Sequence, residues 1–319
     1  MDSKFSTDSL EAEIASISIT YDYGDSLSLE SRERHGWIAD YSTIYDLDRI
    51  DPRPPAQRIP TEILLLIFSY LNFSEANLLQ LSDGPWPLTK VCSRWREIAL
   101  DYPLLWTHVN LDFSYWRYIL GTETRADLIL STFVERSKSL PLNVQIRWRD
   151  IEDASEDAYK AMTLLLSTCH RWKKAVLDIH SVLFYEISPI IMGRLLELEA
   201  LKLNLNPPEK SFRDGQPIID AFQFAPKLRD VCIEGMPYAT RNMRLPWSQL
   251  THLNAYHDHP NPNYHCLRLS PNLVECYLGS HGHLLQSPNG PYRVIELPRL
   301  KKLVLGGKCC PRSPDSLCA

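Results

Sequence analysis

A six-residue run of this sequence, Ile63–Phe68, is apolar without interruption. Pro60 and Glu62 suit the first turn of a helix, because proline lacks the N–H that would stay unbonded there and a carboxylate lies near the positive end of the helix dipole. A surface helix of a soluble protein normally keeps one face polar. A two-turn helix that is apolar on every side must be covered from two directions. We expect the rest of the chain to supply one cover and a second protein to supply the other.

The residues that follow predict two more short helices. Ser74 is a candidate N-cap for a helix that ends at Leu81, and the turn-forming run Ser82–Pro85 comes next. Apolar residues then recur at helical spacing until Pro103, and a strand-like segment occupies 107–111. The apolar positions of this last helix are Val91, Cys92, Trp95, Ile98 and Ala99.

Together these segments resemble an F-box, in the form common in the large basidiomycete-type fungal families. The resemblance covers about 50 residues, although Ile59 replaces the usual leucine and the stretch 80–87 is longer than the loop of the family. The family implies a three-helix module that docks on the Skp-type linker of a cullin–RING ubiquitin ligase. The residues that carry the resemblance are Ile59, Pro60, Glu62, Ile63, Leu64, Ile67, Phe68, Val91, Cys92, Trp95, Arg96, Ile98, Ala99, Leu105 and Trp106.

The resemblance also assigns roles to these residues. Two or three buried aliphatic side chains, each contributing about 1.5–3 kcal/mol, could support a stable interface. Trp95 is expected to be a core anchor, because it lies on the apolar face of its helix. The positions implied to meet the linker, or to shape the surface that it covers, are Pro60, Ile63, Leu64, Ile67 and Val91. The implied core of the module is Phe68, Trp95, Ile98 and Trp106.

A weak pattern of apolar residues recurs in the second half of the chain. Each unit reads apolar, two residues, apolar, one residue, apolar, and successive units begin 30, 22, 23 and 27 residues apart. Leucine-rich repeats have this pattern on their strands and periods of 20–29 residues. An irregular α/β domain with chance matches is the alternative. The units are Leu198/Leu201/Leu203, Leu228/Val231/Ile233, Leu250/Leu253/Ala255, Leu273/Cys276/Leu278 and Leu300/Leu303/Leu305, with Trp172/Ala175/Leu177 as a poorer earlier one.

We therefore expect three parts in a mixed α+β, α/β-repeat fold. Residues 1–56 carry 12 acidic and 5 basic side chains and end in a proline-rich connector, which indicates a largely disordered extension, with a packed helix as the alternative. Residues 57–112 form the F-box. Residues 113–319 form an irregular leucine-rich-repeat-like solenoid with a parallel sheet. A solenoid needs a polar cap, which the end at 308–319 does not show, so we expect a shortened chain.

The net charge, the apolar runs and the cysteines limit the classes of partner and the cellular compartment that we expect. The net charge is −5, and −7 of it lies in residues 1–56, which leaves only +2 elsewhere and argues against nucleic acid. The longest apolar run is far shorter than the ~20 residues of a membrane span. No secretory signal precedes the eight cysteines, and they form no C-x-x-C pair, so we expect an intracellular protein of the cytoplasm or nucleus with free thiols.

Catalytic and metal signatures are weak. Six histidines lie between 252 and 283, but their spacing fits no zinc motif. Cys169 and His170 are adjacent in sequence, which is no evidence for a catalytic pair. We find no G-x-S-x-G, P-loop, G-x-G-x-x-G or H-E-x-x-H motif. The expectation is a non-catalytic adaptor with no cofactor and no metal. An F-box protein without a ligase role, or a metal-dependent enzyme in the C-terminal part, is the alternative.

Overall fold

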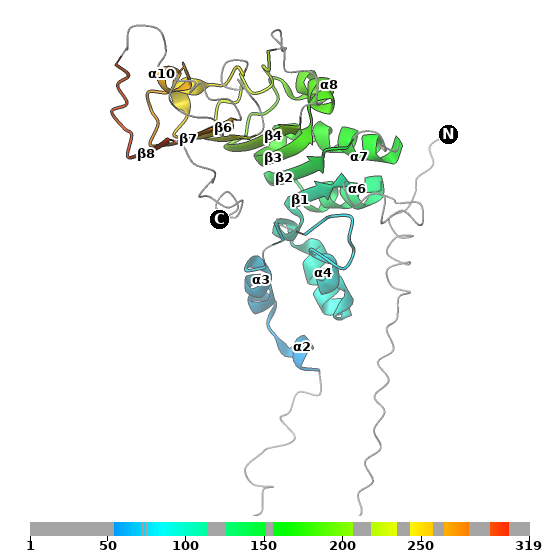
Figure 1. Cartoon of the computed structure of the whole chain (residues 1–319). Helices are drawn as coiled ribbons and strands as arrows, with labels where there is room; N and C mark the ends of the chain where they lie inside the picture. Colours follow the sequence, from blue (N-terminus) through cyan, green and yellow to red (C-terminus); the bar gives the residue numbers. More distant parts are fainter. Residues whose placement is uncertain are drawn as a thin grey trace, which may run out of the picture. The chain divides into compact units, whose positions relative to one another are not determined.

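A computed structural model of the chain describes residues 54–71, 73–74, 76–113, 126–150, 156–206, 218–234, 243–257, 265–280 and 294–305. Most of the predicted acidic extension over 1–56 and the C-terminal residues 306–319 lie outside these ranges. The short helix α2 (Pro55–Arg58) begins at the last residue of the expected proline-rich connector, 49–55, and residues 49–53 of that connector lie outside the described ranges. Figure 1 shows the arrangement of the elements.

The first part of the described chain is helical. The apolar run forms α3 (Thr61–Ser69), with Pro60 as its N-cap residue. It is followed by the 3-10 helix η3 (Trp86–Lys90), by α4 (Ser93–Asp101) and by the 3-10 helix η4 (Pro103–Trp106). Two of the three predicted helices are therefore present at the expected positions.

The prediction of a middle helix over 74–81 is wrong. Its described residues form turns, because their polar groups have partners that a helix would not give them. The Asn77 side-chain Oδ1 accepts a hydrogen bond from the Leu79 backbone N–H at 3.2 Å, a local bond that competes with helix formation. The Leu78 backbone N–H donates to the carbonyl of Asn110 at 2.9 Å, on the first strand of the sheet.

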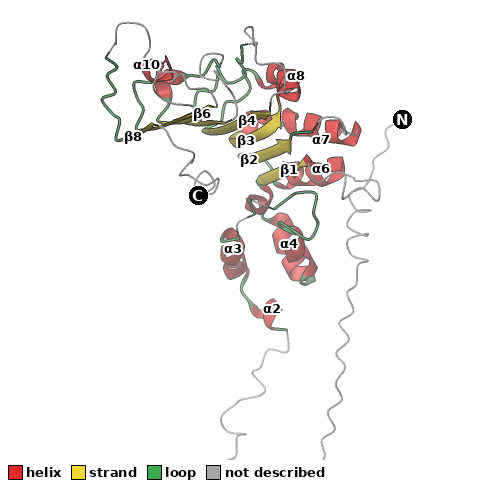
Figure 2. Cartoon of the chain, viewed as in Figure 1, coloured by secondary structure: helices red, strands yellow, loops and turns green. Residues whose placement is uncertain are grey.

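An eight-stranded parallel sheet makes up most of the remaining structure, and each strand pairs with its neighbours in sequence. The prediction of a mixed helix–strand fold with a parallel sheet is confirmed. Crossovers between parallel strands are right-handed, so a sheet whose strands follow one another in sequence order has all its crossovers on one side. Figure 2 shows helices along one side of the sheet. The strands are β1 (His108–Asp112), β2 (Leu142–Trp148), β3 (Trp172–His180), β4 (Ala200–Asn206), β5 (Asp230–Glu234), β6 (His252–His257), β7 (Glu275–Ser280) and β8 (Lys302–Leu305).

Helices connect several of these strands. α6 (Ala126–Arg136) lies between β1 and β2, and α7 (Glu156–Ser167) with the 3-10 helix η6 (Cys169–Arg171) lies between β2 and β3. α8 (Ser181–Ile191) follows β3 directly and contacts both β3 and β4. Further along, the 3-10 helix η7 (Trp247–Gln249) precedes β6, and α10 (His265–Leu269) precedes β7.

Alternate residues of the strands form the core. In β2 the burial pattern alternates without exception, so one face is covered and the other is open. The covered face continues across the sheet in register: Val144 pairs with Ala175, which pairs with Leu201 and then Val231. The five predicted repeat segments coincide with β4 to β8. On β8, however, Leu303 and Leu305 are exposed, whereas the equivalent Cys276 and Leu278 of β7 are buried.

The cysteines of this core are structural thiols. Cys169, Cys266 and Cys276 are buried and free of disulfides. Burial raises the pKa of the Cys266 thiol to about 11 and that of Cys276 to about 12, the latter with a contribution from Cys266 itself. Burial likewise raises the pKa of Cys169. Since the thiolate is the reactive form, these side chains are protonated at neutral pH and are not activated nucleophiles.

Candidate partner-docking surface

The helix α3 divides its apolar side chains between two faces. Leu64 and Phe68, four residues apart, are fully buried. The Phe68 ring meets Trp95 of α4 edge to face, with ring centroids 5.4 Å apart. Residues three and four apart lie on the same face of a helix, so this pair forms the inner face of α3 and packs it against the chain.

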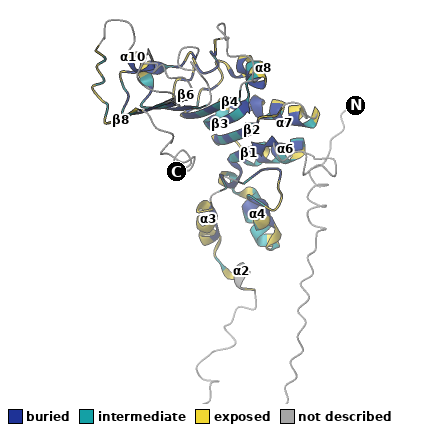
Figure 3. Cartoon of the chain, in the orientation of Figure 1, coloured by how far each residue is buried: buried dark blue, intermediate teal, exposed yellow. Residues whose placement is uncertain are grey.

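The opposite side of α3 is apolar and open to solvent. Ile63 is 47%, Leu66 52% and Ile67 40% exposed, and Tyr70, the residue after the helix, is more exposed still. We call these four residues the α3 apolar face. Figure 3 shows α3 coloured mainly as exposed. Leaving three large aliphatic side chains in water is unfavourable by a few kcal/mol in total, and their contiguity on one helix is typical of an interaction site.

The start of α3 is held in place from α4. The Arg94 guanidinium donates to the backbone carbonyl of Gln57 and, at 3.1 Å, to the Thr61 hydroxyl. Arg96 donates to the carbonyl of Thr89 at 2.8 Å and thereby ties α4 to η3. Charged side chains of α4 thus hold the neighbouring segments by hydrogen bonds to two backbone carbonyls and to the Thr61 hydroxyl, and this helps to set the direction in which α3 presents its outer face.

An aromatic cluster joins this helical part to α6, the helix between β1 and β2. Trp106 of η4 lies 5.2 Å from Trp86 and 5.0 Å from Phe133 of α6, measured between ring centroids. Its indole N–H donates to the carbonyl of Ala99 at 2.9 Å, and the Arg136 guanidinium lies 5.7 Å from its ring. Trp86 and Phe133 are buried with it. The cluster therefore packs α4, η3 and α6 together around one ring.

The structure places the predicted docking residues in different environments. Pro60, Ile63 and Ile67 are exposed around α3, and Val91, half exposed, lies between η3 and α4. Leu64 is fully buried, so of the two roles predicted for these positions it can only shape the docking surface from beneath. Leu66 and Tyr70 were missed, although their spacing of three and seven from Ile63 would have placed them beside it.

The predicted core residues also differ in burial. Phe68 and Trp106 are fully buried, whereas Trp95 and Ile98 are partly exposed. Both of the latter lie on the nine-residue helix α4, in which Ala99 is the buried residue. Trp95 and Ile98 therefore lie at the edge of the packed core and not inside it.

Neither a metal site nor a membrane-spanning helix is found among the described residues. Its residues contain no group of three or more histidine, cysteine or acidic side chains placed to hold a metal ion. Of the six histidines singled out above, His259, His281 and His283 lie outside it. Among the described helices, none has the length and apolarity that crossing a bilayer requires.

The described structure thus combines an exposed apolar helix face with a parallel sheet. Residues 56–112 match the F-box-like family model, which supports an F-box protein. A search among curated proteins finds no significant match to the chain. An F-box-like domain suggests, in general terms, the role of an adaptor in an SCF-type ubiquitin ligase, a role that is generally non-catalytic.

Proposed function

We propose that the chain is the substrate-recognition adaptor of an SCF-type cullin–RING ubiquitin ligase. Residues 57–112 dock on a Skp-type linker, and residues 113–319 bind a target protein. The α3 apolar face supports the docking part of this proposal, because it is solvent-exposed within the segment that matches the F-box-like family. Catalysis of ubiquitin transfer belongs to other subunits, and the adaptor contributes by raising the local concentration of the target.

The target-binding part is an irregular leucine-rich-repeat-like solenoid in this proposal. A recurring backbone arrangement supports it. Near the start of β5, β6, β7 and β8, two successive N–H groups donate to one carbonyl of the preceding unit. Those carbonyls belong to Glu199, Arg229, Thr251 and Val274. Equivalent core positions then align from strand to strand, so each unit is covered by its neighbours as repeat architectures require.

The sheet also begins earlier than the proposed boundary at residue 112. β1 belongs to the F-box-like segment, yet it pairs in parallel with β2, from His108 opposite Asn143 to Asp112 opposite Arg147. A target on the open face of the sheet would consequently be held by the same β-structure that continues into the docking module. This continuity favours an adaptor that fixes its target relative to the linker.

Co-expression tests the proposal. We expect the full chain to co-purify with a Skp-type linker and, through it, with a cullin at near-equal stoichiometry, measured by size-exclusion chromatography with mass determination. A complex that contains the linker but never a cullin would contradict the ligase role and favour an F-box protein with other partners. Absence of any complex with the linker would reject the docking assignment.

A further inference from the structure

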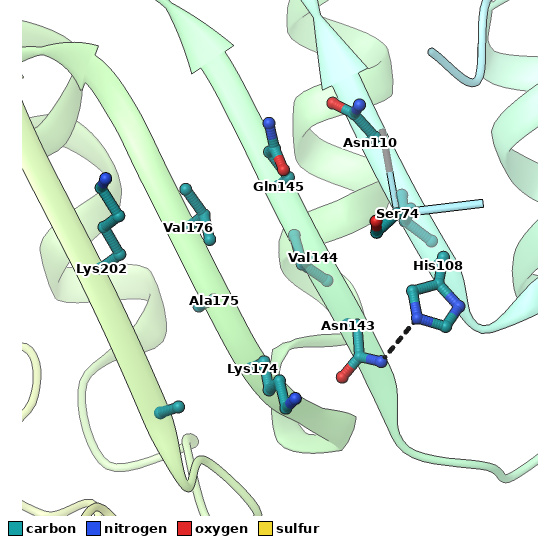
Figure 4. Close-up of a pocket in the computed structure, with 12 residues that line it drawn as sticks. Ser74, His108, Asn110, Asn143, Val144, Gln145, Lys174, Ala175, Val176 and Lys202 are labelled. Atoms are coloured by element: carbon teal, nitrogen blue, oxygen red, sulfur yellow. Dashed lines mark hydrogen bonds between the residues drawn. The ribbon is translucent and has the colours of Figure 1, made fainter. Parts of the chain in front are cut away.

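The open face of the sheet carries a shallow pocket across β1 to β4 (Figure 4). Its floor is apolar and includes Val176 and Ala200. Its rim is polar, and the residues of rim and floor lie in two rows that the strand register aligns. One row is His108, Asn143, Lys174 and Ala200, and the next is Asn110, Gln145, Val176 and Lys202. The pocket is therefore assembled from four strands and the turn residue Ser74, and no single sequence segment supplies it.

Three acidic side chains near this pocket are paired with basic ones. Arg147 pairs with Asp112 at 2.6 Å, and Arg149 pairs with Asp178 at 2.5 Å. Lys202, one of the two lysines of the rim, pairs with Glu234 at 3.1 Å. The other lysine, Lys174, has no ion pair or side-chain hydrogen bond among the described residues. One uncompensated positive charge therefore remains at the rim.

The imidazole of His108 adds no second charge. Burial, and to a smaller extent the nearby Lys174 ammonium, lower the pKa of His108. The Asn143 amide nitrogen lies 3.0 Å from Nε2 of His108, so a neutral ring accepts this hydrogen bond. The rim thus has one cation beside a neutral ring at neutral pH.

Two carboxamides of the rim have unused hydrogen-bonding capacity. Asn110 is buried, and its Oδ1 has no partner among the residues that the structure describes. The Gln145 side chain likewise has none within those residues, and Figure 4 shows it on the strand between Asn110 and Val176. A buried polar atom without a partner is costly. Carboxamides can pair with both the N–H and the C=O groups of a bound backbone.

We infer that this pocket binds an extended, acidic segment of the target protein, with a glutamate or aspartate side chain on Lys174. Its backbone pairs with the carboxamides of Asn110 and Gln145, and an aliphatic part of the segment covers Val176 and Ala200. A carboxylate fits better than a phosphate, because the lining contains no arginine and only one unpaired lysine. This inference rests on the proposed function, since it names the chemistry that the sheet would recognise in a target.

Degenerate peptide pools test the inference on the immobilised full chain. Each pool is an octapeptide mixture with one fixed central residue: Glu, Asp, Gln, Lys or phosphoserine. We expect the Glu and Asp pools to be retained about fivefold more than the Gln and Lys pools at low salt, with less difference as salt is raised. Lys174→Gln should abolish this preference, whereas Lys174→Arg should keep most of it.

The control is Lys301→Gln, which removes the same charge from an exposed site outside the pocket. It should leave the preference unchanged. Equal retention of all pools, or an acidic preference that survives Lys174→Gln in a chain with an unchanged melting temperature, would overturn the inference. Stronger retention of the phosphoserine pool would also overturn it, in favour of a phosphate. Linker binding by Lys174→Gln, measured in parallel, reports on the docking module alone, so the two proposals can fail separately.

Discussion

Replacing Trp106 with alanine is expected to lower the free energy of unfolding by about 3–5 kcal/mol, as large-to-small changes of buried aromatic residues do. The ring is fully buried and touches two other aromatic rings, so its loss leaves a cavity that the rigid neighbours Trp86 and Phe133 cannot fill. The substitution also leaves the carbonyl of Ala99 without its indole donor and removes the ring that faces Arg136.

Urea unfolding of the full chain measures this effect. The matched control is Phe224→Ala, because Phe224 is an exposed aromatic residue and its removal should change the stability by less than about 0.5 kcal/mol. Trp106→Phe should fall between the two, since it keeps an aromatic ring but loses the hydrogen bond. A loss below about 1 kcal/mol for Trp106→Ala would show that the cluster contributes little to holding the helical part against α6.

The second large effect concerns binding and leaves the fold intact. We expect the double variant Ile63→Glu/Ile67→Glu to weaken the affinity for a Skp-type linker by at least about 100-fold, because two charges would be buried against an apolar surface without partners. Both side chains point away from the core, so the melting temperature should stay close to that of the unchanged chain. Titration calorimetry with the purified linker gives the affinity.

A matched pair of residues elsewhere controls for the added charge. Val182 and Ile190 of α8 are 47% and 45% exposed, close to the values for Ile63 and Ile67. The variant Val182→Glu/Ile190→Glu should bind the linker as tightly as the unchanged chain. An affinity for the Ile63→Glu/Ile67→Glu chain within about threefold of the original would exclude the α3 apolar face as the docking surface. Leu64→Asp is unsuitable for this purpose, because Leu64 is fully buried and its replacement would unfold the module.

The sequence predicted the strands of the sheet better than the local structure around α3. The L-x-x-L-x-L spacing places Leu201 and Leu203 on one face of a strand, and the repeats of this spacing identified β4 to β8 in order. The assignment worked because alternation is a local property of a strand. For α3, by contrast, apolar residues lie on every side, so periodicity could not distinguish Leu64, which is buried, from Ile63, which is exposed.

Two further features depended on contacts between distant segments. The helix expected over 74–81 gave way to turns because the Leu78 N–H pairs with Asn110, more than 30 residues away in sequence. The pocket of the open face could not be recognised either. Its rim combines Asn143, Lys174 and Lys202, which lie together only through the strand register. Sequence patterns indicate which residues face outward, but not which of them become neighbours.

In the proposed function, a second protein covers the α3 apolar face. Hydroxyl-radical footprinting of the full chain, alone and with a saturating Skp-type linker, tests it most directly. We predict that Ile63, Leu66 and Ile67 are labelled in the free chain and lose most of that labelling in the complex, while Val182 and Ile190 are labelled equally in both. If the complex forms and the labelling of Ile63, Leu66 and Ile67 is unchanged, the linker does not cover the α3 apolar face.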